Sequence, residues 1–405
     1  MPAIAGLRGT GNFATDERPK NFREMILWLD PNGDAPLTAL LSKMASESVD
    51  DPEFAWWEEK LDAVRVQVNG AQTDSDTAIE VDAGVDGLAG ALALKAGDLL
   101  LNLGSLVAPD NTALGELLFV ASDPASDTAF TAVRGARDST AAVIADNSIL
   151  LKVGSVYGEG ALSPKAISRS PTKVFNYTQI FKDAYQVTRT SKKTNIRTGD
   201  LLKNEKKRKA FDHAVSMEEA FMFGRKFEDT DSDGQPRRST GGLNGFLTSN
   251  RTVFSGGTPF TEDNFINAVA AVFDRSGAGA GNDRLAFMGN GALTELNILA
   301  RNSASSRIFH DESIKVYGMD LQRWILPQGV IYVRTHPLLN TDPILRYSSF
   351  IINPRGLKYR YVTDTMFEDN IETPGADHTK GQWLTECGLE VHHESTMAYL
   401  GNMNA

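Results

Sequence analysis

The chain has 405 residues, of which 41% are hydrophobic and 23% charged, and its formal net charge is −11. This composition belongs to a folded protein large enough for two or three subdomains, and the negative charge argues against a dedicated duplex-DNA binder. The single cysteine, Cys387, excludes an intrachain disulfide and fits a reducing compartment such as the bacterial cytoplasm. No apolar stretch suits a signal peptide or a bilayer span, so we expect neither secretion nor a membrane partner.

Charge is divided unevenly along the chain. Residues 58–150 contain five basic and 15 acidic side chains, whereas residues 160–210 contain 13 basic and three acidic ones. Segments of opposite sign favour contacts between copies of the chain, with the acidic part of one copy facing the basic part of another. Two solvated faces of one monomer remain the alternative, because runs of charge most often face water.

The N-terminal part predicts an arm followed by one short helix. Residues 1–23 are rich in Gly, Ala and charge without periodicity, and we expect them to be flexible until they meet a partner. Pro36 suits the first turn of a helix over Leu37–Met44. The aromatic residues Phe54, Trp56 and Trp57 then lead into an extended segment.

A small β-barrel or sandwich is predicted between Val64 and Val153. Short runs of strand-forming residues recur there, separated by clusters of Gly, Asn, Asp, Ser or Pro. The six strand candidates begin at Val64, Ala78, Asp98, Glu116, Ala129 and Ser148.

A long helix is the most distinctive predicted element. Val174–Thr190 favours an extended arm because it is rich in aromatic and β-branched residues, and Asp200 suits the cap of the helix that follows. Apolar residues then recur at helical spacing, at Ala210, Ala214, Met217 and Phe221. One helix over Leu201–Phe227 would span roughly 40 Å at 1.5 Å per residue, which suits a part that reaches across neighbours.

The C-terminal half mixes helices and strands. We predict a polar loop over residues 227–246, an amphipathic helix at Glu262–Phe273, a strand at Arg284–Met288 and a helix at Ala292–Arg301. Further extended segments are expected at Val330–Arg334, Ile344–Asn353, Tyr359–Val362 and Leu384–Val391. Since strands and helices do not alternate steadily, the predicted class is α+β.

The sequence offers few candidates for catalysis or ligand binding. Asp229, Asp231 and Asp233 match the start of a calcium loop, but Thr240 stands where that loop requires a bidentate Glu. We therefore prefer a polar turn over a metal site. The glycine-rich Ser276–Asn282 follows a helix instead of a strand, which argues against a dinucleotide site. No catalytic or cofactor-binding residue is predicted, and the protein is not expected to be an enzyme.

The histidines and the cysteine do not form a recognisable metal motif either. Cys387 has no second cysteine, and no two histidines have the spacing of a zinc motif. His392 and His393 are adjacent in an expected strand, so they should point to opposite faces and not share a metal.

The clearest candidate surface is a basic run near the start of the long helix, formed by Lys203, Lys206, Lys207, Arg208 and Lys209. Three interpretations stay open: weak, sequence-independent contact with nucleic acid, contact with acidic residues of a neighbouring copy, and a solvated side of the helix. Base stacking with single strands is not expected, because no aromatic residue interrupts the run.

Three segments resemble the major capsid proteins of tailed bacteriophages, those with the Hong Kong 97-type fold. Asn176–Lys226, an arm, a basic turn and a long helix, resembles their E-loop and spine helix. Glu17–Leu61 is similar to the N-arm region of a subfamily with a β-rich insertion in the E-loop region, and Gly388–Met403 is similar to their closing strand.

The resemblance implies a division of the chain into capsid parts. These are an N-terminal arm at 1–50, an E-loop region at 51–195 with its β insertion at about 64–153, a spine helix of the peripheral domain at 196–240, an axial domain at 241–340, and C-terminal strands of both domains at 341–405.

The resemblance also implies a function. Hexamers and pentamers would form an icosahedral head around double-stranded DNA in the host bacterial cytoplasm, without a cofactor, and with separate scaffolding, portal and decoration proteins as partners. In this fold the spine helix lies toward the shell interior, so the basic run would face packaged DNA or a neighbouring subunit. Two alternatives remain: an encapsulin-type compartment shell with the same fold, and a metal-dependent enzyme that uses the acidic loop at Asp229.

Overall fold

The chain divides into two compact units, one inserted into the other. The computed structural model describes residues 36–43, 46–59, 63–84, 88–107, 115–168, 170–194, 196, 199–274, 281–302, 309–316, 319–326 and 328–404. The first unit comprises residues 1–56 and 174–405, and the second comprises residues 57–173. Within the described ranges, no helix has both the length and the apolar character that a membrane crossing requires.

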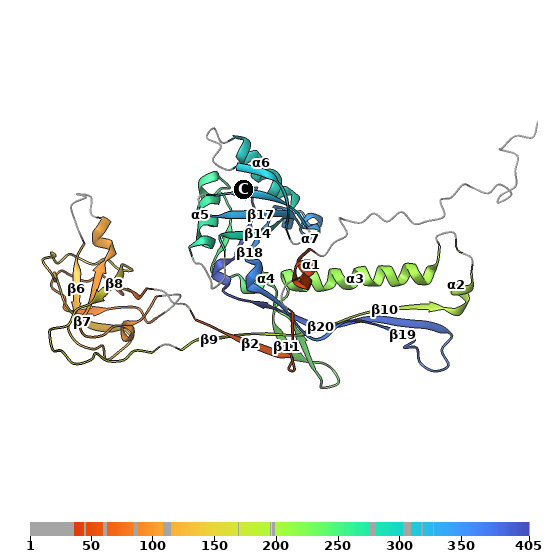
Figure 1. Ribbon diagram of the computed structural model, residues 1–405, viewed down its shortest axis with the longest axis horizontal. Coiled ribbons are helices and arrows are strands. Elements are labelled where there is room, and N and C mark those ends of the chain that lie inside the picture. Colours follow the sequence, from red (N-terminus) through yellow and green to blue (C-terminus); the bar gives the residue numbers. More distant parts are fainter. Residues whose placement is uncertain are drawn as a thin grey trace, which may run out of the picture. The chain divides into compact units, whose positions relative to one another are not determined.

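A four-stranded sheet forms one half of the first unit (Figure 1). Its strand order is β1-β19-β20-β10, formed by Ser46–Ser48, Leu357–Asp369, His378–Val391 and Gln179–Thr188. On β10, Phe181, Tyr185 and Val187 are buried, while the side chains of the opposite face are exposed. One face of the sheet is therefore covered and the other faces solvent in this chain.

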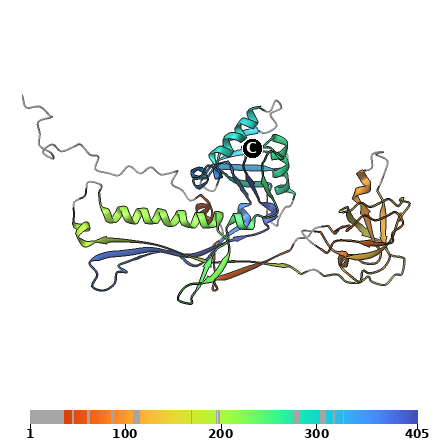
Figure 2. The same cartoon turned by 180° about the vertical axis from the view of Figure 1, so that it is seen from behind.

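Helix α3 (Leu201–Phe223) lies along the covered face of this sheet, as both views show (Figures 1 and 2). The predicted cap is confirmed, because the Asp200 side chain accepts the backbone N–H groups of Leu202 and Lys203. The helix ends at Phe223, not at the predicted Phe227. Gly224 leaves the helical backbone there, and a Cβ at this position would lie 2.4 Å from the carbonyl oxygen of Ala220.

The predicted arm before α3 is confirmed as two strands separated at Thr178. The first is β9 (Thr172–Tyr177), which pairs with β2 (Glu53–Glu58), and the second is β10. A short helix, α2 (Arg189–Lys193), follows β10.

A mixed seven-stranded sheet forms the other half of the first unit. Its order is β13-β21-β18-β14-β17-β16-β15, formed by Arg251–Val253, Ala398–Gly401, Ser349–Ile352, Asp283–Met288, Val330–Thr335, Met319–Ile325 and Phe309–Val316. The central β14 is buried on both faces, so its alternate side chains enter two separate cores.

The two cores connect this sheet with its helices. Leu285 and Phe287 of β14 join the core that contains α3 and α1 (Pro36–Lys43). Ala286 and Met288 join a second core with α5 (Glu262–Phe273) and α6 (Asn290–Asn302). The short helices α4 (Leu243–Phe246) and α7 (Pro337–Thr341) complete the unit. Mixed sheets with segregated helices confirm the predicted α+β class.

Several sequence-based boundaries were wrong. The expected polar loop contains a hairpin of β11 (Phe227–Thr230) and β12 (Pro236–Ser239), stabilised by cross-strand ion pairs. Ile344–Asn353 is not extended throughout, because Leu345–Tyr347 forms a 3-10 turn before β18. Gly388–Met403 is not one strand, since it contains the end of β20 and then β21 of the other sheet.

The second unit is a six-stranded barrel, and the six strand candidates of the sequence are confirmed. The order is β3-β8-β5-β6-β7-β4, formed by Arg65–Gln67, Ile149–Ser155, Asp98–Asn102, Leu117–Val120, Ala129–Val133 and Ala78–Glu80. The N–H of Asn69 donates to the Glu80 carbonyl at 3.0 Å, and the N–H of Asp82 donates to the Gln67 carbonyl at 2.9 Å. These bonds join the first and last strands, so the sheet closes on its own apolar core and leaves few open edges.

Candidate functional site

The long helix α3 is fixed to the four-stranded sheet by a buried histidine. His213 is 2% exposed, and its Nδ1 lies 2.9 Å from the Asp183 carboxylate of β10. Its Nε2 lies 2.7 Å from the Thr385 hydroxyl of β20. One side chain therefore bonds to two neighbouring strands, which sets the position of the helix on the sheet.

Two turns before His213, Lys206 connects the same face of α3 to the long β19–β20 hairpin. Its Nζ lies 2.8 Å from the Asp369 carboxylate and 4.7 Å from the centre of the Phe367 ring. Asp369 also accepts the Tyr185 hydroxyl at 2.7 Å. The hydrogen bond from Lys206 lowers the pKa of Asp369, and the same bond raises the pKa of Lys206. Both groups are thereby held in their charged forms.

The other members of the basic run point around the helix and do not form one uniform face. Arg208 pairs with Glu205 at 2.8 Å and Lys209 pairs with Asp212 at 2.9 Å, both within α3. Lys203 lies 4.0 Å from Asp200 but is 83% exposed, and Lys207 is exposed as well. The structure therefore separates Lys206, which holds the fold together, from the outward-facing Lys203, Lys207 and Arg208.

The acidic triplet at residues 229–233 is used by the β11–β12 hairpin itself. Asp229 forms an ion pair with Arg237 across the two strands, and the hydrogen bond from Arg237 lowers the pKa of Asp229. Asp231 Oδ1 accepts the backbone N–H groups of Asp233 and Gln235, both at 2.9 Å. The carboxylates of Asp229 and Asp231 thus have separate roles, one in the strand pair and one in the turn. No group of three or more His, Cys, Asp or Glu side chains suited to a metal occurs in the described ranges.

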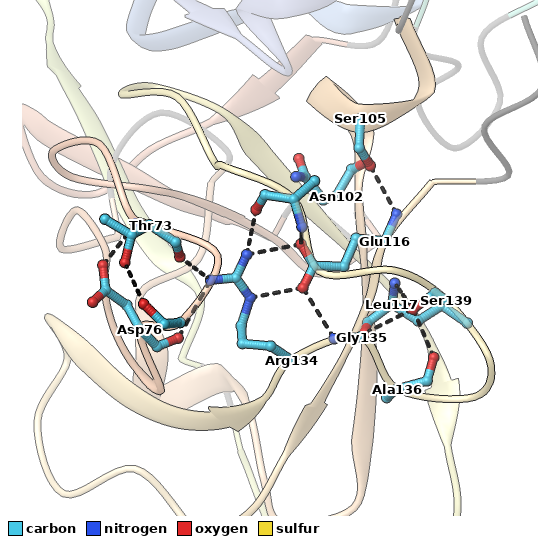
Figure 3. Close-up of polar contacts among 12 residues, drawn as sticks. Thr73, Asp76, Asn102, Ser105, Glu116, Leu117, Arg134, Gly135, Ala136 and Ser139 are labelled. Atoms are coloured by element: carbon cyan, nitrogen blue, oxygen red, sulfur yellow. Dashed lines mark hydrogen bonds and ion pairs between the residues drawn. The ribbon is translucent and has the colours of Figure 1, made fainter. Parts of the chain in front are cut away.

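The barrel contains a buried ion pair that the sequence did not single out (Figure 3). Glu116 is fully buried, and it accepts the Nε and Nη2 hydrogens of Arg134 at 2.7 and 2.9 Å. The same carboxylate accepts the backbone N–H groups of Gly135 and Ala142 at 3.2 and 3.1 Å. Arg134 in turn donates to the carbonyl of Thr73. The pair therefore connects three loops of the barrel.

Cys387, His392 and His393, the remaining candidate residues, are not arranged for catalysis or metal binding in the described part of the chain. Cys387 is buried in the core, and burial raises its pKa to about 12, so the thiol stays protonated. His392 and His393 follow the end of β20, and His393 has a φ of 50°, so the strand predicted for the two histidines was wrong. Residues 276–280 of the predicted glycine-rich connector lie outside the described residues, as does the predicted arm over residues 1–23.

Comparison with known proteins identifies the family. The family model described as SU10 major capsid protein matches residues 8–404. The major capsid protein of Pseudomonas phage PaMx41 is 25% identical over 368 residues, which is 89% of this chain and 83% of that protein. These findings define a structural protein of a phage capsid. The chain belongs to the SU10 major capsid protein family, and its place is the shell of the virion.

Some solved structures are similar to this chain at low sequence identity. The capsid of a native GTA particle has a TM-score of 0.46 and 10% identity, covering 98% of this chain and 99% of that one. The capsid of Myoviridae phage XM1 has a TM-score of 0.39 and 15% identity, covering 62% and 81%. The SrpI encapsulin of Synechococcus elongatus PCC 7942 has a TM-score of 0.40 and 9% identity, covering 58% and 78%. Because these TM-scores are below 0.5, the assignment rests on the family match.

The prediction of a phage major capsid protein is thus confirmed, and the family match favours it over the encapsulin alternative. The sequence patterns did not reveal the ion pair of Glu116 and Arg134 or the buried contact of Glu218 with His336. No local signal marks these pairs, since the partners of the second are 118 residues apart.

Proposed function

We propose that this capsid protein has the Hong Kong 97-type fold and that its hexamers and pentamers close the icosahedral head of a tailed phage around double-stranded DNA. The observation that carries the proposal is the family match over residues 8–404. Assembly would take place in the host bacterial cytoplasm with separate scaffolding, portal and decoration proteins, and no catalytic role is included.

In this proposal each part of the chain has a capsid role. Residues 1–50 form the N-terminal arm and residues 51–195 form the E-loop region with the barrel as its insertion. Residues 196–240 form the part of the peripheral domain that contains the spine helix, α3, and the β11–β12 hairpin. Residues 241–340 form most of the axial domain, and residues 341–405 supply strands to the axial and peripheral domains. The extended β9–β10 segment before a 23-residue α3 supports the E-loop and spine assignment.

Contact between copies is assigned to the segment that follows the barrel. Residues 156–168 are exposed throughout, and the apolar side chain of Leu162 is 92% exposed. On the outward face of the four-stranded sheet, Ile180 of β10 is 55% exposed and Met366 of β19 is 42% exposed. Burying such side chains between copies gives a modest gain per contact, which the many contacts of a closed shell multiply.

The outward-facing Lys203, Lys207 and Arg208 are assigned to weak contact with packaged DNA or with acidic residues of a neighbour. Lys206 is left out because Asp369 and two aromatic rings already surround its ammonium group. Either contact would weaken as salt rises, because exposed charges are screened within about 8 Å at physiological ionic strength.

The experiment that tests the proposal is expression of the chain alone and with its neighbouring open reading frames, followed by electron microscopy of the high-mass fraction. Closed shells or capsomer rings are the expected result, and a product that stays monomeric in every combination contradicts it. Leu162→Asp should lower the shell yield at least about tenfold, the effect of roughly 1.4 kcal/mol lost per contact. Val143→Asp is the matched control, because Val143 is 69% exposed on the barrel. An equal shell yield from both variants would contradict the assignment of a contact to Leu162.

A further inference from the structure

Helix α1 has little in its own sequence to hold its first turn. It is eight residues long, Pro36–Lys43, and helices of this length are not stable in water by themselves. The first turn of a helix leaves backbone N–H groups without partners, which a Ser, Thr, Asp or Asn before the helix normally accepts. The residue before Pro36 in the sequence is Ala35, which has no side-chain oxygen.

Glu218, from the middle of the buried part of α3, supplies the missing acceptors. Its Oε1 accepts the N–H of Leu37 at 2.7 Å, and its Oε2 accepts the N–H of Thr38 at 2.7 Å. The Thr38 hydroxyl also donates to Oε2 at 2.6 Å. A carboxylate 180 residues away thus caps α1, and its negative charge lies where the helix dipole favours an anion.

His336 fixes the orientation of this carboxylate. Its Nε2 lies 2.7 Å from Glu218 Oε1, and its Nδ1 lies 3.3 Å from the N–H of Leu338 in α7. Because Nδ1 accepts the backbone N–H, the ring proton sits on Nε2 and is donated to Glu218. Both side chains are almost fully buried, at 0% and 1% exposed. Glu218 therefore joins α3, α1 and the start of α7 at one point.

We propose that Glu218 is a positioning residue for assembly. It is a latch that holds α1, which the proposed function assigns to the N-terminal arm, against α3 and the start of α7. Without the carboxylate, the N–H groups of Leu37 and Thr38 lose their side-chain acceptor at once. The three leucines of α1 remain available to the core, but they do not by themselves hold the helix ordered. The assembly part of this inference rests on the proposed function, whereas the local part does not.

The local part is tested by hydrogen exchange on the full chain carrying Glu218→Ala, with Glu218→Gln as the milder change. The amides of α1 should exchange at least about 30-fold faster in Glu218→Ala, while those of α3 and β14 keep their protection. Glu218→Gln should lie between this variant and the unaltered chain, because an amide retains one acceptor oxygen but presents a donor to the other N–H. Glu219→Ala is the matched control, since Glu219 is the next residue and is exposed.

The assembly part is tested by the shell yield of the same variants. The latch is supported if the shell yield falls most in the variant whose α1 amides exchange fastest. Unchanged α1 exchange, loss of protection across α3 and β14 together, or normal shells despite a released α1 would each overturn it. If the unaltered chain forms no shells, the proposed function fails, and the exchange pattern still decides whether Glu218 holds α1.

Discussion

Replacing Glu116 by alanine should unfold the barrel unit at a much lower temperature. The substitution leaves the Arg134 guanidinium, whose side chain is 6% exposed, without its counter-charge. Removing one partner of a buried ion pair typically costs about 3–5 kcal/mol. Two backbone N–H groups, of Gly135 and Ala142, also lose their acceptor. Since Arg134 keeps its bonds to carbonyl oxygens, we take about 4 kcal/mol for the total and do not add the separate terms.

The assay is calorimetry of the full chain, with hydrogen exchange to assign the transition to the barrel. For a unit of this size 1 kcal/mol corresponds to roughly 4–8 °C, so the barrel transition should fall by at least about 15 °C. Replacing Glu116 and Arg134 together by Met should cost less than the two single changes combined, because neither charge is then left alone. Glu80→Gln, on the exposed side of β4, should leave the transition within about 2 °C. A Glu116→Ala barrel that melts within 2 °C of the unaltered chain would refute the reasoning.

Two further predictions concern the first unit. Arg284→Met should lower the free energy of unfolding by about 3 kcal/mol, because Arg284 is 2% exposed and its guanidinium donates to four backbone carbonyls. Urea unfolding measures this loss, and a loss no larger than that of the exposed control Arg251→Met contradicts the prediction. Asp369→Asn should weaken the acid sensitivity of the fold, because the hydrogen bond from Lys206 holds the pKa of Asp369 below its ordinary value of 3.8. A lowered folded-state pKa adds stability above the unfolded-state pKa, and this stability is lost as pH falls through the folded-state value. The difference in melting temperature between the two proteins should therefore be constant near neutral pH and shrink progressively as pH falls below about 4. An unchanged difference from about pH 7 down to about pH 2 would count against the prediction.

Short-range patterns in the sequence were sufficient to predict most of the helices and strands. The helix at Glu262–Phe273 was predicted with its observed ends because its apolar residues recur at helical spacing. In the structure the Thr261 side chain caps its first turn. The six strands of the barrel were found from short runs of strand-forming residues separated by turn signals. The Asp200 cap could also be predicted from the sequence, because a capping side chain accepts amides only two or three residues away.

The errors occurred where a tertiary contact decided the boundary. The end of α3 depends on Gly224, where the chain passes so close to the Thr240 carbonyl that a Cβ would lie 2.5 Å from it. The hairpin after α3 was missed because its charged residues look like a solvated loop in sequence, and only their cross-strand pairing makes them strands.

By itself the sequence determined the class, the long helix, the inserted unit of short strands and the family, because each depends on local periodicity or on order along the chain. The tertiary structure decided that the inserted strands close into a barrel instead of a sandwich. Only the tertiary structure decided which polar residues hold the protein together. Lys206 and Arg208 are equivalent in sequence, yet one is enclosed by Asp369 and aromatic rings while the other is exposed on α3. Glu218 and Glu219 are neighbours of the same type, yet one is buried under α1 and the other faces outward. The physical reason is that hydrogen bonding and burial depend on the segments that folding brings together, and these partners lie more than 100 residues away along the chain.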